Sequence, residues 1–121
     1  MKKPSVKVKI TLPEWVATKK PVHVLAIDTV CPYFVIHHNY EGANKWGKDW
    51  MLTHVPTGAS ICGPVRGLRA YVTLRNLAAA LGALEDVDWK KMELTYGALD
   101  YSALPTSVKL WINRINQAYA V

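Results

Sequence analysis

The sequence contains few of the residues that mark several common protein classes. Its 121 residues include two cysteines, one phenylalanine and 9 acidic side chains against 15 basic ones. Two cysteines are too few for a disulfide scaffold, so we expect reduced thiols and a cytoplasmic protein. No apolar run approaches the length of a membrane-spanning helix. Residues Pro4 to Leu12 alternate in polarity, so we expect no signal peptide there. These absences exclude a membrane-spanning protein and a disulfide scaffold.

The residues that are abundant indicate one folded domain. Half of the chain is hydrophobic, which argues against disorder through lack of burial. The length suits a single domain over residues 1–121 and excludes a multidomain enzyme. Five tryptophans and six tyrosines stand against the one phenylalanine. Their polar tips suit half-exposed positions better than a sealed core.

The first half of the chain predicts β-strands. Residues Ser5–Leu12 alternate strictly between apolar and polar side chains, which is typical of a strand with one buried face. The polar segment Tyr40–Asp49 contains two glycines and is expected to be a loop, and Gly63–Gly67 is expected to end the sheet. Apolar runs between turn residues predict further strands at Val22–Asp28, Tyr33–Asn39, Trp50–Val55 and Ala59–Cys62.

The second half predicts helices. The first apolar stripe leaves two starting points open, one near Val65 and one at Thr73, which would then be the capping residue. Asp88 is expected to cap a short helix through Tyr96, and Pro105 to open the last helix. We therefore predict an α+β fold in which an antiparallel sheet of four to five strands, within residues 5–62, packs against two to three helices within residues 66–120. The two long stripes are Tyr71, Leu74, Leu77, Ala78, Leu81 and Leu84, and Val108, Trp111, Ile112, Ile115 and Tyr119.

Some residues are suitable zinc ligands but lack a zinc-binding spacing. His37 and His38 are adjacent on a predicted strand and must point to opposite faces. The register of the following hairpin decides whether His54 and Cys62 lie on the same face of the sheet. If Val55 pairs with Gly58, Cys62 faces away from His54, and if Val55 pairs with Ala59, the two share a face. We expect no metal site and no cofactor. The full candidate set is Cys31, His37, His38, His54 and Cys62.

The sequence also lacks a complete catalytic arrangement. The three carboxylates Glu85, Asp86 and Asp88 cluster at a helix junction, where capping explains them. No nucleophile elbow or oxyanion hole is recognisable. We therefore expect a protein without enzymatic activity.

Basic and aromatic residues coincide in one segment. Residues 1–75 hold 11 of the 15 basic side chains and 4 of the 9 acidic ones. Within this half, lysines and tryptophans alternate in the predicted loop, and two arginines precede or open the first long helix. Lysines that hold phosphates beside indoles that stack on bases suit a single-stranded nucleic acid, and an exposed tryptophan equally suits a protein hot spot. The candidate binding residues are Lys45, Trp46, Lys48, Trp50, Arg66 and Arg69.

The two arginines also suggest an anion-binding surface at the start of the first long helix. If the helix begins near Val65, then Arg66, Arg69, Thr73 and Asn76 lie on one face and form an anion-binding surface with the free N–H groups of the helix start. If the helix begins at Thr73, this face does not form.

One segment carries a resemblance. Trp50–Gly58 reads WMLTHVPTG and precedes a Gly/Pro break and an Ala/Leu-rich helix. This arrangement, over about Phe34 to Leu84, resembles small uncharacterised proteins of phages and other mobile elements in which a strand ends in Thr-His-x-Pro-Thr-Gly before a helix. Some mobile-element proteins of this size are anti-CRISPR or other anti-defence inhibitors that bind a host protein or ribonucleoprotein and block its nucleic-acid site. The resemblance implies no catalytic residue.

Three hypotheses follow. The first is a non-enzymatic accessory or inhibitory protein, anti-CRISPR-like, that docks on a host protein or ribonucleoprotein through its basic, tryptophan-containing surface. The second is a protein that binds single-stranded DNA or RNA directly. The third is a small metal-dependent enzyme.

Overall fold

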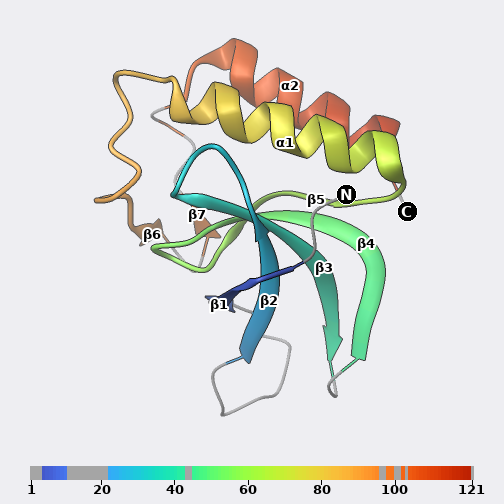
Figure 1. The fold of residues 1–121 in the computed structure, drawn as a ribbon. Coiled ribbons are helices and arrows are strands. Elements are labelled where there is room, and N and C mark those ends of the chain that lie inside the picture. The colour runs from blue at the N-terminus through green and yellow to red at the C-terminus, as the bar shows by residue number, and fades with distance from the viewer. Residues whose placement is uncertain are drawn as a thin grey trace.

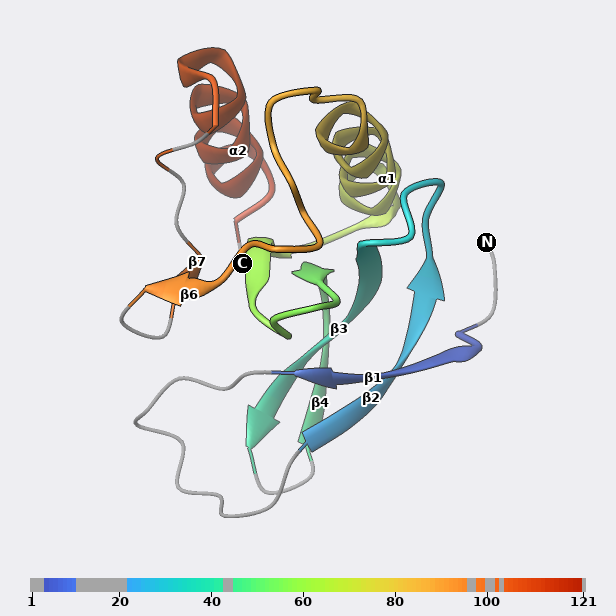
Figure 2. The same cartoon turned by 90° about the vertical axis from the view of Figure 1, so that its left-hand side faces the viewer.

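An antiparallel sheet forms the N-terminal part of the protein, and two helices cover one of its faces (Figures 1 and 2). The structure is a computed structural model that describes residues 4–10, 22–42, 45–95, 98–99, 102 and 104–120. Within these residues the sheet has five strands in the order β1-β2-β3-β4-β5, each antiparallel to the next. The strands are β1 (Val6–Ile10), β2 (Val22–Asp28), β3 (Phe34–Gly42), β4 (Lys45–His54) and β5 (Ser60–Val65).

The helices follow the sheet in the chain, which confirms the predicted α+β architecture. Helix α1 spans Leu68–Gly82 and helix α2 spans Thr106–Ala118. A small hairpin of β6 (Leu94–Thr95) and β7 (Ala98–Leu99) comes between the two helices in the sequence. Figure 2 shows the two helices side by side on the same face of the sheet. Neither helix is long and apolar enough to cross a membrane.

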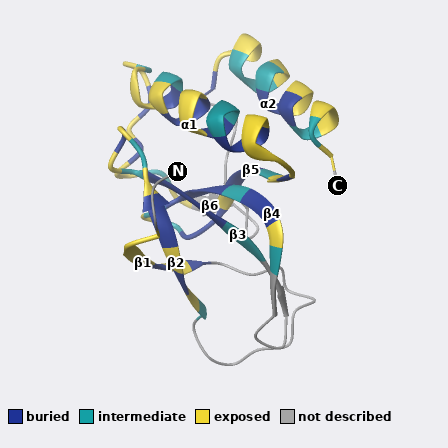
Figure 3. Cartoon of the chain, turned by 45° about the vertical axis from the view of Figure 1, so that its right-hand side comes forward, coloured by how far each residue is buried: buried dark blue, intermediate teal, exposed yellow. Residues whose placement is uncertain are grey.

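Two cores lie on opposite faces of the sheet. The larger one lies between the sheet and the helices and includes Phe34, Ile36 and Leu52 on the strands and Leu74 and Leu77 on α1. The smaller one lies on the other face, where β1 and β2 fold over β3, and is formed by Val8, Ile10, Val24, Ala26 and Val35. Figure 3 shows buried residues on the inner sides of both helices and exposed residues on their outer sides. Successive side chains of β3 therefore point alternately into the larger and the smaller core.

The predicted loop at Tyr40–Asp49 was wrong. Strand β3 continues to Gly42 and β4 begins at Lys45, with Tyr40 opposite Trp46 in the ladder. Two register shifts between His38 and Gly42 interrupt the alternation that sequence patterns detect. Pairing between long neighbouring strands satisfies the backbone whatever the polarity of the side chains, so a polar segment extends the hairpin here.

The predicted sheet end at Gly63–Gly67 was also placed too early, because β5 runs through Pro64 to Val65. Proline is tolerated because β5 is the last strand in the sheet order, where a missing N–H breaks no central ladder. Gly63 has φ +113°, and a Cβ there would lie 2.6 Å from the Trp50 carbonyl oxygen. The Asn116 side chain of α2 accepts a hydrogen bond from the Gly63 N–H at 2.9 Å, which ties this helix to β5.

The predicted short helix from Asp88 to Tyr96 does not form. Residues 85–91 are turns and open chain, and β6 begins at Leu94. Asp88 does act as a cap, because its Oδ1 accepts the N–H groups of Lys90 and Lys91, but the turn does not continue. Tertiary packing explains this, since the neighbouring Trp89 is buried in the larger core.

A close approach between α1 and the turn after β2 predicts a measurable effect. A Cβ on Gly82 would lie 2.9 Å from the Cys31 Sγ and 3.0 Å from its Cβ. We expect Gly82→Ala to lower the free energy of unfolding by about 1 kcal/mol, because a clash of about 1–3 kcal/mol exceeds the gain of about 1 kcal/mol in helix propensity. Chemical denaturation measures the effect, and Cys31→Ala should restore part of it in the double variant. Equal losses with and without Cys31→Ala would contradict the contact.

Candidate binding surface

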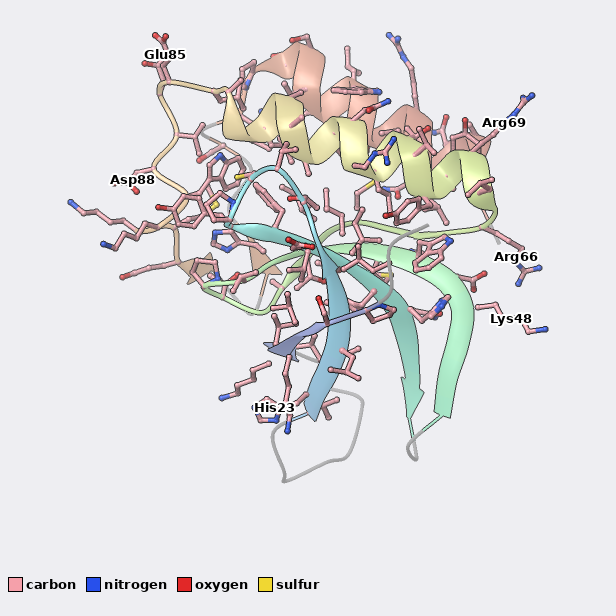
Figure 4. All side chains as sticks on the ribbon, viewed as in Figure 1. His23, Lys48, Arg66, Arg69, Glu85 and Asp88 are labelled. Atoms are coloured by element: carbon pink, nitrogen blue, oxygen red, sulfur yellow. The ribbon has the colours of Figure 1, made fainter. Side chains whose placement is uncertain are left out.

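Three candidate binding residues form an exposed basic group at one side of the molecule, here called the basic end: Lys48 on β4, Arg66 between β5 and α1, and Arg69 in the first turn of α1. Figure 4 shows all three extending outward on the same side, with Glu85 and Asp88 on the opposite side. Lys48 and Arg69 have no ion pair with another side chain of the described residues. Their charges are therefore available to a partner.

Arg66 has a different environment because it binds a carboxylate. Its Nε donates a hydrogen bond of 2.9 Å to Asp49 Oδ1. The Asp49 side chain is 6% exposed and the Arg66 side chain 64%. The Arg66 backbone N–H also donates to the Tyr119 carbonyl. Arg66 thus neutralises a buried carboxylate and presents the rest of its guanidinium to solvent.

Trp50 does not belong to the exposed surface, and its prediction as a partner contact is corrected here. It is 8% exposed and packs in the larger core, stacked on His38 with ring centroids 4.1 Å apart and tilted against Tyr71 at 5.2 Å. The alternation of β4 places Trp50 on the same sheet face as Leu52, which is the face that the helices cover. Trp50 is therefore a core residue on the strand that carries Lys48.

The remaining two candidates lie in the extended hairpin. The backbones of Lys45 and Trp46 belong to β4, opposite Gly42 and Tyr40. Their side chains lie outside the described part of the structure, so their role in binding stays a prediction.

The start of α1 falls between the two predicted positions. The helix begins at Leu68 after Gly67, which has φ +103°, and its first turn contains neither a side-chain cap nor an acidic residue. Arg69, Thr73 and Asn76 still share a helix face, but Arg66 precedes the helix and binds Asp49 instead. The Thr73 hydroxyl donates to the Arg69 carbonyl at 2.8 Å. The four-residue anion surface is thus only partly assembled.

The histidine candidates lie in separate places, with His37 and His54 buried and His38 half-buried. His37 and His38 point to opposite faces, as predicted: His38 stacks on Trp50, whereas His37 hydrogen-bonds to Thr53. His37 donates from Nδ1 to the His38 carbonyl at 2.7 Å and accepts from the Thr53 hydroxyl at Nε2. Burial lowers the pKa of His37 below its ordinary value of 6.5. Its imidazole is therefore neutral and fully hydrogen-bonded.

His54 is bound in a similar way on the other face. Its Nε2 donates to the Trp89 carbonyl at 2.6 Å, and its Nδ1 accepts from the Thr57 hydroxyl at 2.8 Å. Burial lowers its pKa as well. Both predicted registers occur, because Thr53 pairs with Ser60 as in the first and, beyond a register shift, Leu52 pairs with Cys62 as in the second. Cys62 lies against Asn116 rather than His54.

Cys62 is a structural thiol. It donates to Asn116 Oδ1 at 3.4 Å, and burial raises its pKa to about 12, so it is protonated at neutral pH. In the described part of the chain, no three histidine, cysteine or carboxylate groups lie close enough to hold a metal ion.

One feature that the sequence did not indicate is a groove at the other end of α1, here called the acidic groove. It has a volume of about 690 Å³ and lies between the turn after β2, the end of α1 and the segment that follows it. Glu85, Asp86 and Asp88 all line it, and Asp88 also acts as a cap through its bonds to the N–H groups of Lys90 and Lys91. Residues at three places in the chain form this groove, so no local pattern could have revealed it.

The fold and its basic end place the chain among small α+β proteins with an antiparallel sheet and an exposed charged surface. Comparisons with protein-family models, with curated proteins and with solved structures give no match to this chain.

Proposed function

We propose that this protein is a non-enzymatic accessory protein of a phage or other mobile element, anti-CRISPR-like in its action, that docks on a host protein or ribonucleoprotein through its basic end. The observation that carries the proposal is a pair of exposed cations, Lys48 and Arg69, which form no ion pair with the described residues. They lie beside Arg66, whose guanidinium is oriented by Asp49. A charge held in place by a buried partner loses little conformational entropy on binding. The resemblance of the Thr-His-Val-Pro-Thr-Gly segment to mobile-element proteins supplies the biological setting.

The packing of aromatic rings near the basic end favours specific docking on a partner over nonspecific electrostatic attraction. Trp50, two residues after Lys48 on β4, stacks on His38 of β3 and packs at a tilt against Tyr71 of α1. Trp46 lies four residues before Trp50 on β4 and is proposed as the apolar anchor beside these charges. A partner with an acidic or phosphate-bearing surface would complement the basic end.

Charge reversal at the basic end tests this proposal. We expect Lys48→Glu combined with Arg69→Glu to weaken partner binding at least tenfold, because each cation would contact the opposite charge on the partner. The measurement is affinity capture from host extract, with and without nuclease, followed by titration of the captured partner. The matched control is Lys91→Glu, which reverses an exposed charge in the turn after α1. Undiminished binding by the double variant would contradict the proposal.

Direct binding of nucleic acid is the second candidate, and one observation favours it. Lys7 and Lys9 are both exposed on β1, at alternate positions that place them on one side of the strand. Two cations in a row suit a phosphate backbone.

A titration of a labelled single-stranded oligonucleotide at several salt concentrations separates the two candidates. Direct binding would make the affinity fall steeply with salt, and Lys7→Gln with Lys9→Gln would reduce the logarithmic slope by about 1–2. The docking proposal expects no binding to the free oligonucleotide.

A further inference from the structure

The acidic groove carries charge of the opposite sign to the rest of the chain. The protein has a formal net charge of +6, yet the described lining of the groove contains Glu85, Asp86 and Asp88 and no lysine or arginine. Glu85 and Asp86 are exposed and form no ion pair with another side chain of the described residues. Lys90 and Lys91 follow in the chain but do not line the groove. The groove therefore presents uncompensated negative charge.

The position of these carboxylates is electrostatically unfavourable for the fold. They follow Gly82, the last residue of α1, and the last turn of this helix contains no basic residue. The C-terminal end of a helix carries partial negative charge, so carboxylates beside it repel the helix dipole. A local arrangement that costs stability without a structural gain is typical of a functional site. A bound cation would relieve the repulsion.

Apolar residues also line the groove. Val30, in the turn after β2, is 78% exposed, and Tyr33 on the same turn is half-buried. Cys31 and Trp89 also line the groove and are buried. The volume of about 690 Å³ lies within the range of sites that enclose a ligand. An apolar lining beside exposed carboxylates suits a long aliphatic stem that ends in a positive charge.

We propose that the acidic groove binds a lysine- or arginine-containing peptide segment of a partner protein. A metal ion does not fit, because no three metal-ligating groups converge among the described residues. A peptide supplies both a charged head for Glu85 and Asp86 and an apolar part for Val30 and Tyr33. The groove and the basic end lie at opposite ends of α1, about 22 Å apart along its 15 residues. The two surfaces could thus be occupied together.

The probe is a labelled hexapeptide in which two arginines alternate with two leucines between terminal glycines, titrated by fluorescence anisotropy into the full chain. We expect saturable binding that Glu85→Gln combined with Asp86→Gln weakens at least tenfold. Glu93→Gln, which neutralises an exposed carboxylate outside the groove, should leave the affinity unchanged. Val30→Ser should weaken binding several-fold because it replaces an exposed apolar lining residue with a polar one.

Thermal unfolding distinguishes loss of a site from loss of the fold. The double Glu85→Gln, Asp86→Gln variant should unfold at the same or a higher temperature than the wild type, because it removes the repulsion at the helix end. The proposal is overturned if the double variant binds the peptide as well as the wild type does. Equally tight binding of spermidine, or association between copies of this chain that the double variant abolishes, would also overturn it by assigning the groove to another occupant.

Discussion

Replacing Trp89 with alanine is expected to lower the free energy of unfolding by about 3–5 kcal/mol, as removal of a buried tryptophan from a core does. Trp89 is 4% exposed, and its ring packs edge-on against Phe34 with centroids 4.8 Å apart. Its indole N–H donates to the Leu81 carbonyl, and its own carbonyl accepts from His54. One side chain thus fastens the segment after α1 to both the helix and the sheet. Urea or guanidinium denaturation measures the loss.

Trp89→Phe is the control for this prediction. It keeps an aromatic ring in the core but removes the indole N–H, which donates to the Leu81 carbonyl alongside the Leu84 N–H. We expect it to cost about 1–3 kcal/mol, clearly less than Trp89→Ala. If alanine and phenylalanine cost the same, the ring packing would contribute little and the prediction would be wrong. A loss below 1 kcal/mol for Trp89→Ala would contradict the buried position itself.

Acid is expected to destabilise the protein through two buried histidines. Burial lowers the pKa values of His37 and His54 below 6.5, and both imidazoles are neutral in the fold. In the unfolded chain these histidines bind protons as the pH falls through about 6.5, whereas in the folded chain they bind protons only at a lower pH. The unfolded state then binds more protons, so stability falls with the pH. Above about pH 6.5 both states are neutral and neither histidine contributes a pH dependence.

The linkage relation sets the limit of this effect. Each histidine contributes at most about 1.4 kcal/mol per pH unit below 6.5, so the two together lower the free energy of unfolding by at most about 3 kcal/mol near pH 5.5. Urea unfolding at pH 7.5 and 5.5 measures this difference. His37→Gln and His54→Gln should each flatten the pH dependence, whatever they do to stability at pH 7.5. His23→Gln is the control, because His23 is exposed on β2. Equal stability at the two pH values in the wild type would refute the prediction.

The two proposed surfaces carry opposite charge and lie at opposite ends of α1. The basic end begins where α1 begins, and the acidic groove lies where it ends. The helix positions both surfaces because its first residues follow β5 and its last residues pack against Cys31. An adaptor with this layout would bind an anionic surface and a cationic peptide at the same time. The charge-reversal and groove variants act on different ends, so each proposal can fail alone.

Local sequence patterns gave much of the architecture. Strict alternation predicted β1, the apolar run Val22–Asp28 matched β2, and the periodic stripe after Pro105 predicted α2. Periodicity is informative in these segments because each buries a single face. The extended β3–β4 hairpin and the unformed helix after Asp88 were mispredicted for one common reason. Pairing and packing with residues distant in the sequence overrode the local preference.

Some features of the candidate sites also follow from the sequence, whereas others depend on the tertiary structure. The sequence alone determined that basic residues concentrate in the first 75 positions and that His37 and His38 point to opposite faces, since composition and the two-residue period of a strand require no knowledge of the partners. Only the tertiary structure decided that Trp50 is buried, that Arg66 binds Asp49, and that Glu85 and Asp86 line a groove with Val30. Each of these depends on contacts between segments far apart in the chain, where burial and charge pairing are set by the fold as a whole.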